Sequence, residues 1–191
     1  MVTEIYGFLS VSDVIYIRPL CEADADVSWR WRNDSEVWRY TGGQPDRVIT
    51  PQLEHDWIQR ALTDATCKRF AICLSEKDQY IGNVQLSDID TNAGTAEFHI
   101  FIGERSVWGR GYGTLATQQM LKYAKDIMGL RSIFLFVNEA NIPAVHVYQK
   151  LGFVFGNEFE QKPNGRMRKM KLDLASFSTD ARGDVHFKKG D

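Results

Sequence analysis

The sequence predicts a mixed α/β (α+β) fold in which helices flank one central, mostly antiparallel, twisted sheet of about seven strands. Helix-like segments stand early in the chain, a run of strand-like segments follows, and a strand–helix–strand–helix order then precedes a last pair of strands. The 191 residues suit one domain of ordinary size, so we expect a single domain over 1–191. We place its core at about 14–174 and interpret 175–191 as a polar, loosely ordered tail.

The first part of the chain is predicted to form one strand and two helices. An apolar-rich strand covers 14–20, and the segment 22–34 has a helical composition with an acidic first turn that suits the helix dipole. A loop rich in Gly and Pro covers 41–51. A helix follows over 51–65, with Pro51 at or near its first position.

The second part of the chain supplies the remaining strands. Three strands are expected over 69–75, 80–86 and 94–103, the first two joined as a hairpin. The elements after them are a helix over 114–128, a strand over 131–138, a helix over 141–152 that ends at Gly152, and two strands over 153–159 and 166–174.

Composition narrows the class of protein. The hydrophobic fraction of 43% and charged fraction of 25% are ordinary for a soluble globular domain. The net charge of −2 predicts neither a nucleic-acid nor a membrane partner. No stretch is long enough for a membrane span, and the first residues do not resemble a signal peptide. Cys21, Cys67 and Cys73 lack metal-ligand spacing, so we expect reduced, mostly buried thiols, no metal and a cytoplasmic location.

The stretch WGRGYGT, residues 108–114, predicts an anion site. A predicted strand ends just before it and a helix begins at about Thr114, so free N–H groups of Gly111 and Gly113 stand beside the charge of Arg110. The alternative is a glycine turn that only connects strand to helix. A dinucleotide fingerprint needs a third glycine where Thr114 stands, and a P-loop needs Gly-Lys-Ser/Thr, so both of these motifs fit poorly.

Two segments in the expected order and spacing resemble the GNAT superfamily of N-acetyltransferases. VWGRGYGTLATQQMLKYA is similar to the family's acetyl-CoA pyrophosphate loop, and SIFLFVNEANIPAVHVYQKLGFV is similar to its later motif. The segments IRPL…WRND, AEFHIFIGERSVWGRGYGT and HVYQKLGF look most like the RimJ/RimL-type branch, which contains ribosomal-protein, polyamine and aminosugar acetyltransferases. One letter departs from the family pattern, because Trp108 stands where the wider family has Gln or Arg.

The resemblance implies that acetyl-CoA is the co-substrate, with its diphosphate on the N–H groups of the glycine loop. The cofactor-binding residues that we predict are Phe101, Ile102, Arg110, Gly111, Gly113, Thr114, Asn138 and Asn141. Asn138 ends a predicted strand, where an amide can bind the pantetheine or brace the loop. Asn141 precedes Pro143, so it is also a candidate helix N-cap, and we favour the cap.

Attack of an amine on a thioester requires a base for the ammonium proton and an acid for the departing sulfur. The resemblance makes Tyr148 the acid, although Val145, Tyr148 and Leu151 also share a helix face that suits simple packing. Glu97 is the candidate base, because side chains alternate in TAEFHIFI and place it on the face opposite the apolar one. The alternative is a solvated outer face. His99 shares that face and is the reserve base.

The acceptor site is expected near the segment 28–43. We predict substrate contacts from Trp31, Arg32, Asn33, Glu97 and His99, while most of the segment could equally be ordinary helix packing. The acceptor is expected to be a small amine, either an aminosugar or a polyamine, attacked directly in a ternary complex because no cysteine suits an acyl carrier. The segment 159–170 has no acidic cluster that would indicate a polyamine.

Two other functions stay open at this point. One is acetylation of a protein N-terminus, as in the ribosomal-protein enzymes of the same branch. The other is a non-catalytic acyl-CoA-binding sensor. The sequence also leaves open a homodimer as the assembly.

Overall fold

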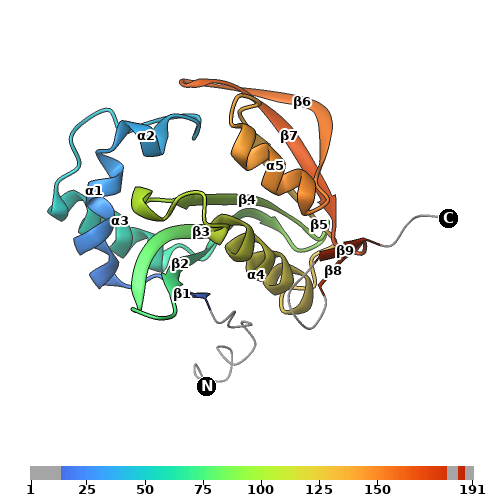
Figure 1. The fold of residues 1–191 in the computed structure, drawn as a ribbon, viewed down its shortest axis with the longest axis horizontal. Helices are drawn as coiled ribbons and strands as arrows, with labels where there is room; N and C mark the ends of the chain where they lie inside the picture. The colour runs from blue at the N-terminus through green and yellow to red at the C-terminus, as the bar shows by residue number, and fades with distance from the viewer. Residues whose placement is uncertain (1–13, 180–184, 188–191) are drawn as a thin grey trace.

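The computed structural model describes residues 14–179 and 185–187. Seven strands form one sheet in the spatial order β1-β2-β3-β4-β5-β7-β6 (Figure 1). They are β1 (Ile15–Pro19), β2 (Lys68–Leu74), β3 (Gln79–Asp90), β4 (Thr95–Ile102), β5 (Ser132–Val137), β6 (Val154–Lys162) and β7 (Gly165–Asp173). All neighbours run antiparallel except β4 and β5, which run parallel. The predicted sheet is confirmed in strand number and in its mostly antiparallel pairing.

Helices cover both faces of this sheet. The helices are α1 (Ala25–Arg32), α2 (Ser35–Trp38), α3 (Pro51–Thr63), α4 (Tyr112–Asp126) and α5 (Ile142–Lys150). Phe70 and Ile72 of β2 join the core cluster that includes α4 and α5, whereas Ala71 and Cys73 join the cluster that includes α1 and α3. Because side chains alternate along a strand, these two clusters lie on opposite faces of the sheet.

The predicted helix over 22–34 is present in the structure but ends two residues early, at Arg32. A 3₁₀ turn covers Glu22–Asp24, α1 ends at Arg32, and α2 begins at Ser35. Between them, the side-chain amide of Asn33 donates to the carbonyl oxygen of Ile49 at 2.8 Å, and an oxygen of Asp34 accepts from the N–H of Glu36 at 2.9 Å. Short polar side chains that bond the backbone in this way compete with helical hydrogen bonds and separate α1 from α2.

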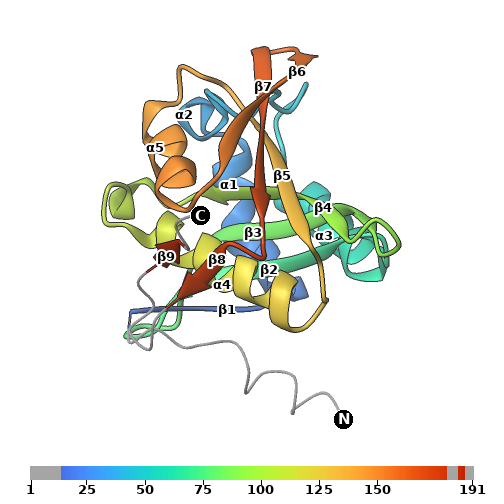
Figure 2. The same ribbon diagram turned by 90° about the vertical axis from the view of Figure 1, so that its right-hand side faces the viewer.

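The length of β3 and the pairing of β4 shape the site. β3 runs to Asp90, past its predicted end at residue 86, and its register against β4 shifts between Ser87 and Asp90. β4 pairs with β5 only through Thr95, Ala96 and Glu97, although both strands continue further. Figure 2 shows β5 leaving β4 at a steep angle. The two parallel strands therefore separate in the middle of the sheet.

The expectation of a loosely ordered tail over 175–191 is wrong for its described part. Phe177 is 3% exposed and belongs to the main core, and its carbonyl oxygen accepts from Nζ of Lys125 at 2.6 Å. A short strand β8 (Phe177–Thr179) pairs with β9 (Val185–Phe187). A single aromatic side chain among polar neighbours is enough to dock this segment, because its burial removes a large apolar area from water. The rest of the predicted tail, 180–184 and 188–191, lies outside the described residues.

The three cysteines differ in exposure. Cys73 is buried, Cys67 is half-buried and Cys21 is exposed, all as free thiols, so the expectation of mostly buried thiols is wrong for Cys21. Among the helices of the described chain, none has the length and apolar character needed to cross a membrane.

Candidate active site

The separation of β4 and β5 opens a gap lined by backbone groups. The N–H of Gly103 donates to the carbonyl oxygen of Ile81 in β3 at 2.9 Å, so backbone groups of this residue point toward β3. The carbonyl oxygen of Ile102 points the other way and accepts from Nε1 of Trp108 at 2.8 Å. Since backbone direction alternates along a strand, the N–H and C=O of Ile100 also face the gap. An extended ligand can pair with these groups as a further strand would.

The glycine loop lies at the start of α4. Gly109 and Gly111 have φ values of 74° and 82°, a region that glycine adopts without strain. The first hydrogen bond of the helix runs from the N–H of Leu115 to the carbonyl oxygen of Gly111 at 3.2 Å. Within the described chain, the N–H groups of 110–114 donate to no acceptor. These groups include the predicted diphosphate ligands, and together they form a helix N-terminus that suits an anion.

Open space lies in front of this loop. A Cβ built on Gly109, Gly111 or Gly113 would meet no atom within 4 Å. The positive φ explains why glycine stands at 109 and 111. Gly113, in contrast, lies inside the first turn of α4, and neither its φ nor its packing within the chain requires a glycine. Room beside free N–H groups is what a bound diphosphate needs, so the loop fits the diphosphate of acetyl-CoA.

Tyr148 lies on α5 with its ring buried on the α4 side of the sheet. The ring makes edge-to-face contacts with Phe98, at a centroid distance of 6.3 Å, and with Phe153, at 5.7 Å. Burial raises the pKa of Tyr148, which keeps the hydroxyl protonated. No described residue hydrogen-bonds to this hydroxyl. Buried tyrosines usually have a partner for the O–H, so this one is free to donate to a ligand.

Glu97 lies next to Phe98 in β4, at the point where β4 and β5 separate, and its side chain points to the opposite face. Its side chain is 16% exposed, and one carboxylate oxygen lies 3.5 Å from Nε2 of His99. Burial, followed by the charge and hydrogen-bonding carboxyl of Asp88, raises the pKa of Glu97 to about 7. A carboxyl with this pKa suits a general base at neutral pH. His99 is held by Ser87 Oγ at 2.9 Å, and removal from water lowers its pKa.

Three carboxyl groups from separate strands, one of them that of Glu97, lie close enough to interact. Asp88 of β3 and Glu160 of β6 both act electrostatically on Glu97 of β4, and Lys162 pairs with Glu160. Asp88 and Glu160 were not predicted from the sequence, since Asp88 lies between two predicted strands and 159–170 shows no acidic cluster of its own. Folding creates the cluster from residues far apart in the chain. Within the described chain, no group of His, Cys, Asp and Glu side chains has the arrangement of a metal site.

The residues predicted to contact substrate from the first helices are engaged in packing. Trp31 is 5% exposed, and a Cβ on Gly103 would lie 2.1 Å from its ring, so that glycine is required by close approach. The guanidinium of Arg32 lies between the rings of Trp38, at 5.2 Å, and Trp57, at 5.1 Å. These contacts agree with the alternative of ordinary helix packing.

The amide of Asn33 is also fully engaged, because it exchanges two hydrogen bonds of 2.8 Å with the backbone of Ile49. An acceptor contact from Trp31, Arg32 or Asn33 stays a prediction.

The other predicted cofactor residues lie around the gap. Asn141 is the N-cap of α5, since its Oδ1 accepts from the N–H of Ala144 at 3.3 Å, which confirms the favoured cap. Asn138 holds the turn before it by accepting from Ala140 N–H at 2.9 Å. Phe101 packs edge-on against Trp31, with ring centroids 6.1 Å apart, at the end of β4. A direct contact of these side chains with a cofactor stays a prediction.

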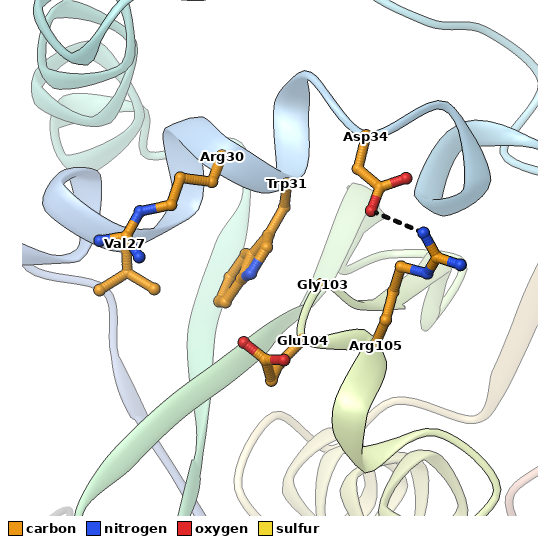
Figure 3. A pocket seen from close by; sticks show the side chains of 7 residues that line it. All are labelled: Val27, Arg30, Trp31, Asp34, Gly103, Glu104 and Arg105. Atoms are coloured by element: carbon orange, nitrogen blue, oxygen red, sulfur yellow. Dashed lines mark hydrogen bonds and ion pairs between the residues drawn. The ribbon is translucent and has the colours of Figure 1, made fainter.

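A cavity of about 190 Å³ lies between α1 and the segment that leads into the glycine loop. Figure 3 shows Trp31 beside it and the ion pair of Asp34 with Arg105, whose atoms are 3.3 Å apart. Neither Glu97 nor Tyr148 lines this cavity. The ion pair connects the first helices to the segment that leads into the glycine loop.

Comparisons with known proteins agree with this geometry. Residues 15–154 match the family described as the acetyltransferase (GNAT) domain. The spermidine N(1)-acetyltransferase of Escherichia coli strain K12 is 30% identical over 140 residues, which cover 73% of this chain and 72% of that protein. The corresponding Vibrio cholerae enzyme is 32% identical over 157 residues, covering 81% and 88%.

The fold is also found among solved structures. The crystal structure of spermidine N-acetyltransferase from Vibrio cholerae in complex with CoA and spermine has a TM-score of 0.74 at 23% identity, covering 84% of this chain and 96% of that one. These findings confirm the predicted fold and the predicted N-acetyltransferase with acetyl-CoA as its co-substrate. The chain therefore belongs to the GNAT acetyltransferase family.

Proposed function

We propose that this enzyme acetylates a primary amine of a polyamine, a small acceptor that carries more than one positive charge. The observation that carries the proposal is the cluster of Asp88, Glu97 and Glu160, which come from strands on both sides of the gap between β4 and β5. Lys162 offsets only part of this negative charge. A cleft lined by one sign of charge concentrates ligands of the opposite sign. The spermidine acetyltransferases among the relatives support the same acceptor class.

Acetyl-CoA is proposed to lie in the gap between the two strands. The free N–H groups of Arg110, Gly111, Gly113 and Thr114 would hold the diphosphate, with the charge of Arg110 beside it. The backbone of Ile100 would pair with the pantetheine. This arrangement brings the thioester to the region where Glu97 and Tyr148 stand on opposite sides of β4.

The two side chains divide the proton transfers between them. The Glu97 carboxylate takes a proton from the ammonium group, and the free amine attacks the thioester carbonyl. As the new C–N bond forms and the C–S bond breaks, the Tyr148 hydroxyl gives its proton to the departing sulfur. The second proton lost by the nitrogen restores the tyrosine hydroxyl. The products are the amide, CoA as a thiol, and one proton that Glu97 returns to solvent.

Three finer predictions from the sequence accompany this proposal. They are membership of the RimJ/RimL-type branch, assembly as a homodimer and a cytoplasmic location.

An acceptor screen tests the proposal directly. The purified enzyme is given acetyl-CoA with spermidine, spermine, an aminosugar or a peptide with a free N-terminus, and thiol release is followed. We expect kcat/KM to be highest for the polyamines, because only they place a second cation beside the carboxylate cluster. A peptide as best acceptor would support the protein N-terminal alternative. Binding of acetyl-CoA without turnover on any amine would support the sensor alternative.

A further inference from the structure

A bulge in β3 places an acidic residue beside the proposed base. Ser87 stands opposite Glu97 and Asp90 opposite Thr95, so two residues of β3, one of them Asp88, face the single residue Ala96 of β4. Asp88 has a φ of 47°, in the left-handed region. The other non-glycine residue with positive φ among the described residues, Asp78, lies in the turn between β2 and β3, where such a conformation is ordinary.

The bulge determines on which face of the sheet the carboxyl group of Asp88 lies. In a regular strand, Asp88 would follow the alternation of Leu86, which is fully buried on the α4 side. An unpaired charge there would be costly. The extra residue breaks the alternation, and the carboxyl of Asp88 instead comes within hydrogen-bonding reach of Glu97. Glycine adopts this φ with less strain than aspartate, although aspartate and asparagine tolerate it better than most other residues.

The two carboxyl groups are not equivalent. Asp88 is exposed, whereas the side chain of Glu97 is 16% exposed. A negative charge is therefore harder to sustain on Glu97 than on a carboxyl group that is exposed to water.

We propose that Asp88 is a positioning residue for the proton transfer: held beside Glu97 by the bulge in β3, its carboxylate makes Glu97 the group that takes the proton from the bound amine. This inference rests on the proposed function, in which Glu97 is the base. The other charged or titratable groups around Glu97 are His99 on β4 and the pair Glu160 and Lys162 on β6. Glu160 acts in the same direction as Asp88 and Lys162 in the opposite one, and burial is the largest single cause.

The substitution Asp88→Asn tests the charge while keeping the shape. Asparagine also tolerates positive φ, so the bulge should persist. With spermidine as acceptor, we expect the acid limb of kcat/KM against pH to move down by about one pH unit, as removal of a neighbouring like charge dictates. The plateau should fall several-fold, because Glu97 becomes a weaker base.

Two further variants separate charge from backbone effects. Asp88→Gly removes the carboxyl and relieves any strain, so it should move the acid limb in the same way, and it serves if the asparagine variant folds poorly. Asp90→Asn changes an aspartate two positions along the same strand, whose carboxylate accepts from the N–H groups of Asn92 and Ala93 in the turn. The Asp90→Asn variant should lower the Tm without moving the acid limb of kcat/KM against pH.

Three results overturn or redirect the inference. An unmoved acid limb in both Asp88 variants overturns it. A higher KM for spermidine with an unmoved limb also overturns it, and makes Asp88 an acceptor contact instead. Glu97→Gln distinguishes failure of this inference from failure of the proposed function. Full activity in Glu97→Gln overturns Glu97 as the base. An inactive Glu97→Gln, together with an unmoved acid limb in Asp88→Asn, overturns only the role of Asp88.

Discussion

The indole N–H of Trp108 donates to the carbonyl oxygen of Ile102 at 2.8 Å, and this bond joins the glycine loop to the end of β4. The guanidinium of Arg105 lies 5.7 Å from the Trp108 ring. The residue that departs from the family pattern thus contributes a structural bond on the gap side of the strand. It holds the predicted diphosphate loop at a fixed place relative to the backbone that faces the pantetheine.

Trp108→Phe removes this bond and keeps an aromatic ring. Because an ordinary hydrogen bond contributes about 1 kcal/mol, we expect the KM for acetyl-CoA to rise about fivefold, with kcat little changed. Initial rates at varied acetyl-CoA measure the effect. Trp29→Phe is the matched control, since Trp29 lies on α1 and its indole N–H has no partner within the described chain. Equal KM values for the two variants would contradict the bracing role.

Tyr148→Phe removes the proposed acid without removing the ring that packs against Phe98 and Phe153. We expect kcat to fall about 100-fold or more, the range typical of a lost general acid, while KM for both substrates and the Tm stay close to the parent values. Tyr123→Phe is the control, because that ring packs on Phe70 at 5.1 Å and burial also raises its pKa. Full turnover by Tyr148→Phe would show that Tyr148 contributes packing and is not the general acid.

The pH dependence of kcat/KM should report Glu97. Its pKa is raised to about 7, and only the carboxylate can accept the ammonium proton. Activity should therefore be present above this pKa and be lost as the pH falls through it, with one proton taken up. Tyr148 should add no basic limb in the neutral range, because burial raises its pKa further from neutrality. An acid limb more than two units below neutrality would exclude this assignment.

The same raised pKa predicts that the base destabilises the fold when charged. The folded-state pKa of Glu97 lies above its ordinary value of 4.5, so the folded protein binds more protons than the unfolded chain between the two values. The contribution of Glu97 to stability therefore declines as pH rises through this window. We expect Glu97→Gln to raise the Tm at about pH 8, and to change it little at about pH 4, below both pKa values, where Glu97 is mostly protonated in both states. Equal effects on the Tm at both pH values would mean that burial of the charged Glu97 carboxylate does not destabilise the folded protein.

Features that depend on neighbours in sequence could be predicted from sequence. The glycine loop at 109–113 is a local arrangement of φ angles and free N–H groups, and Asn141 caps the helix that begins next to it. Glu97 and Tyr148 could be singled out by strand alternation and by the resemblance of their motifs.

The acidic cluster could not be predicted in the same way. Asp88 reaches Glu97 only because β3 contains a bulge, and one inserted residue reverses the face of every side chain after it. Glu160 joins them only because β6 folds back along β7 at the edge of the sheet. Both contacts depend on strand register, which periodicity in a single sequence does not determine.

Gly113→Ala tests whether glycine at this position serves the stability of the fold or the binding of acetyl-CoA. A Cβ here would meet no atom of the chain within 4 Å, and alanine favours a helix over glycine by about 0.5 kcal/mol, so the variant should fold at least as well as the parent. The added methyl group would occupy the space proposed for the diphosphate. We therefore expect an unchanged or slightly raised Tm together with a KM for acetyl-CoA raised about tenfold or more, as loss of close backbone contact to a phosphate implies. The KM for spermidine is the internal control and should not change. A stabilised variant with parental acetyl-CoA affinity would show that this face of the loop does not hold the diphosphate.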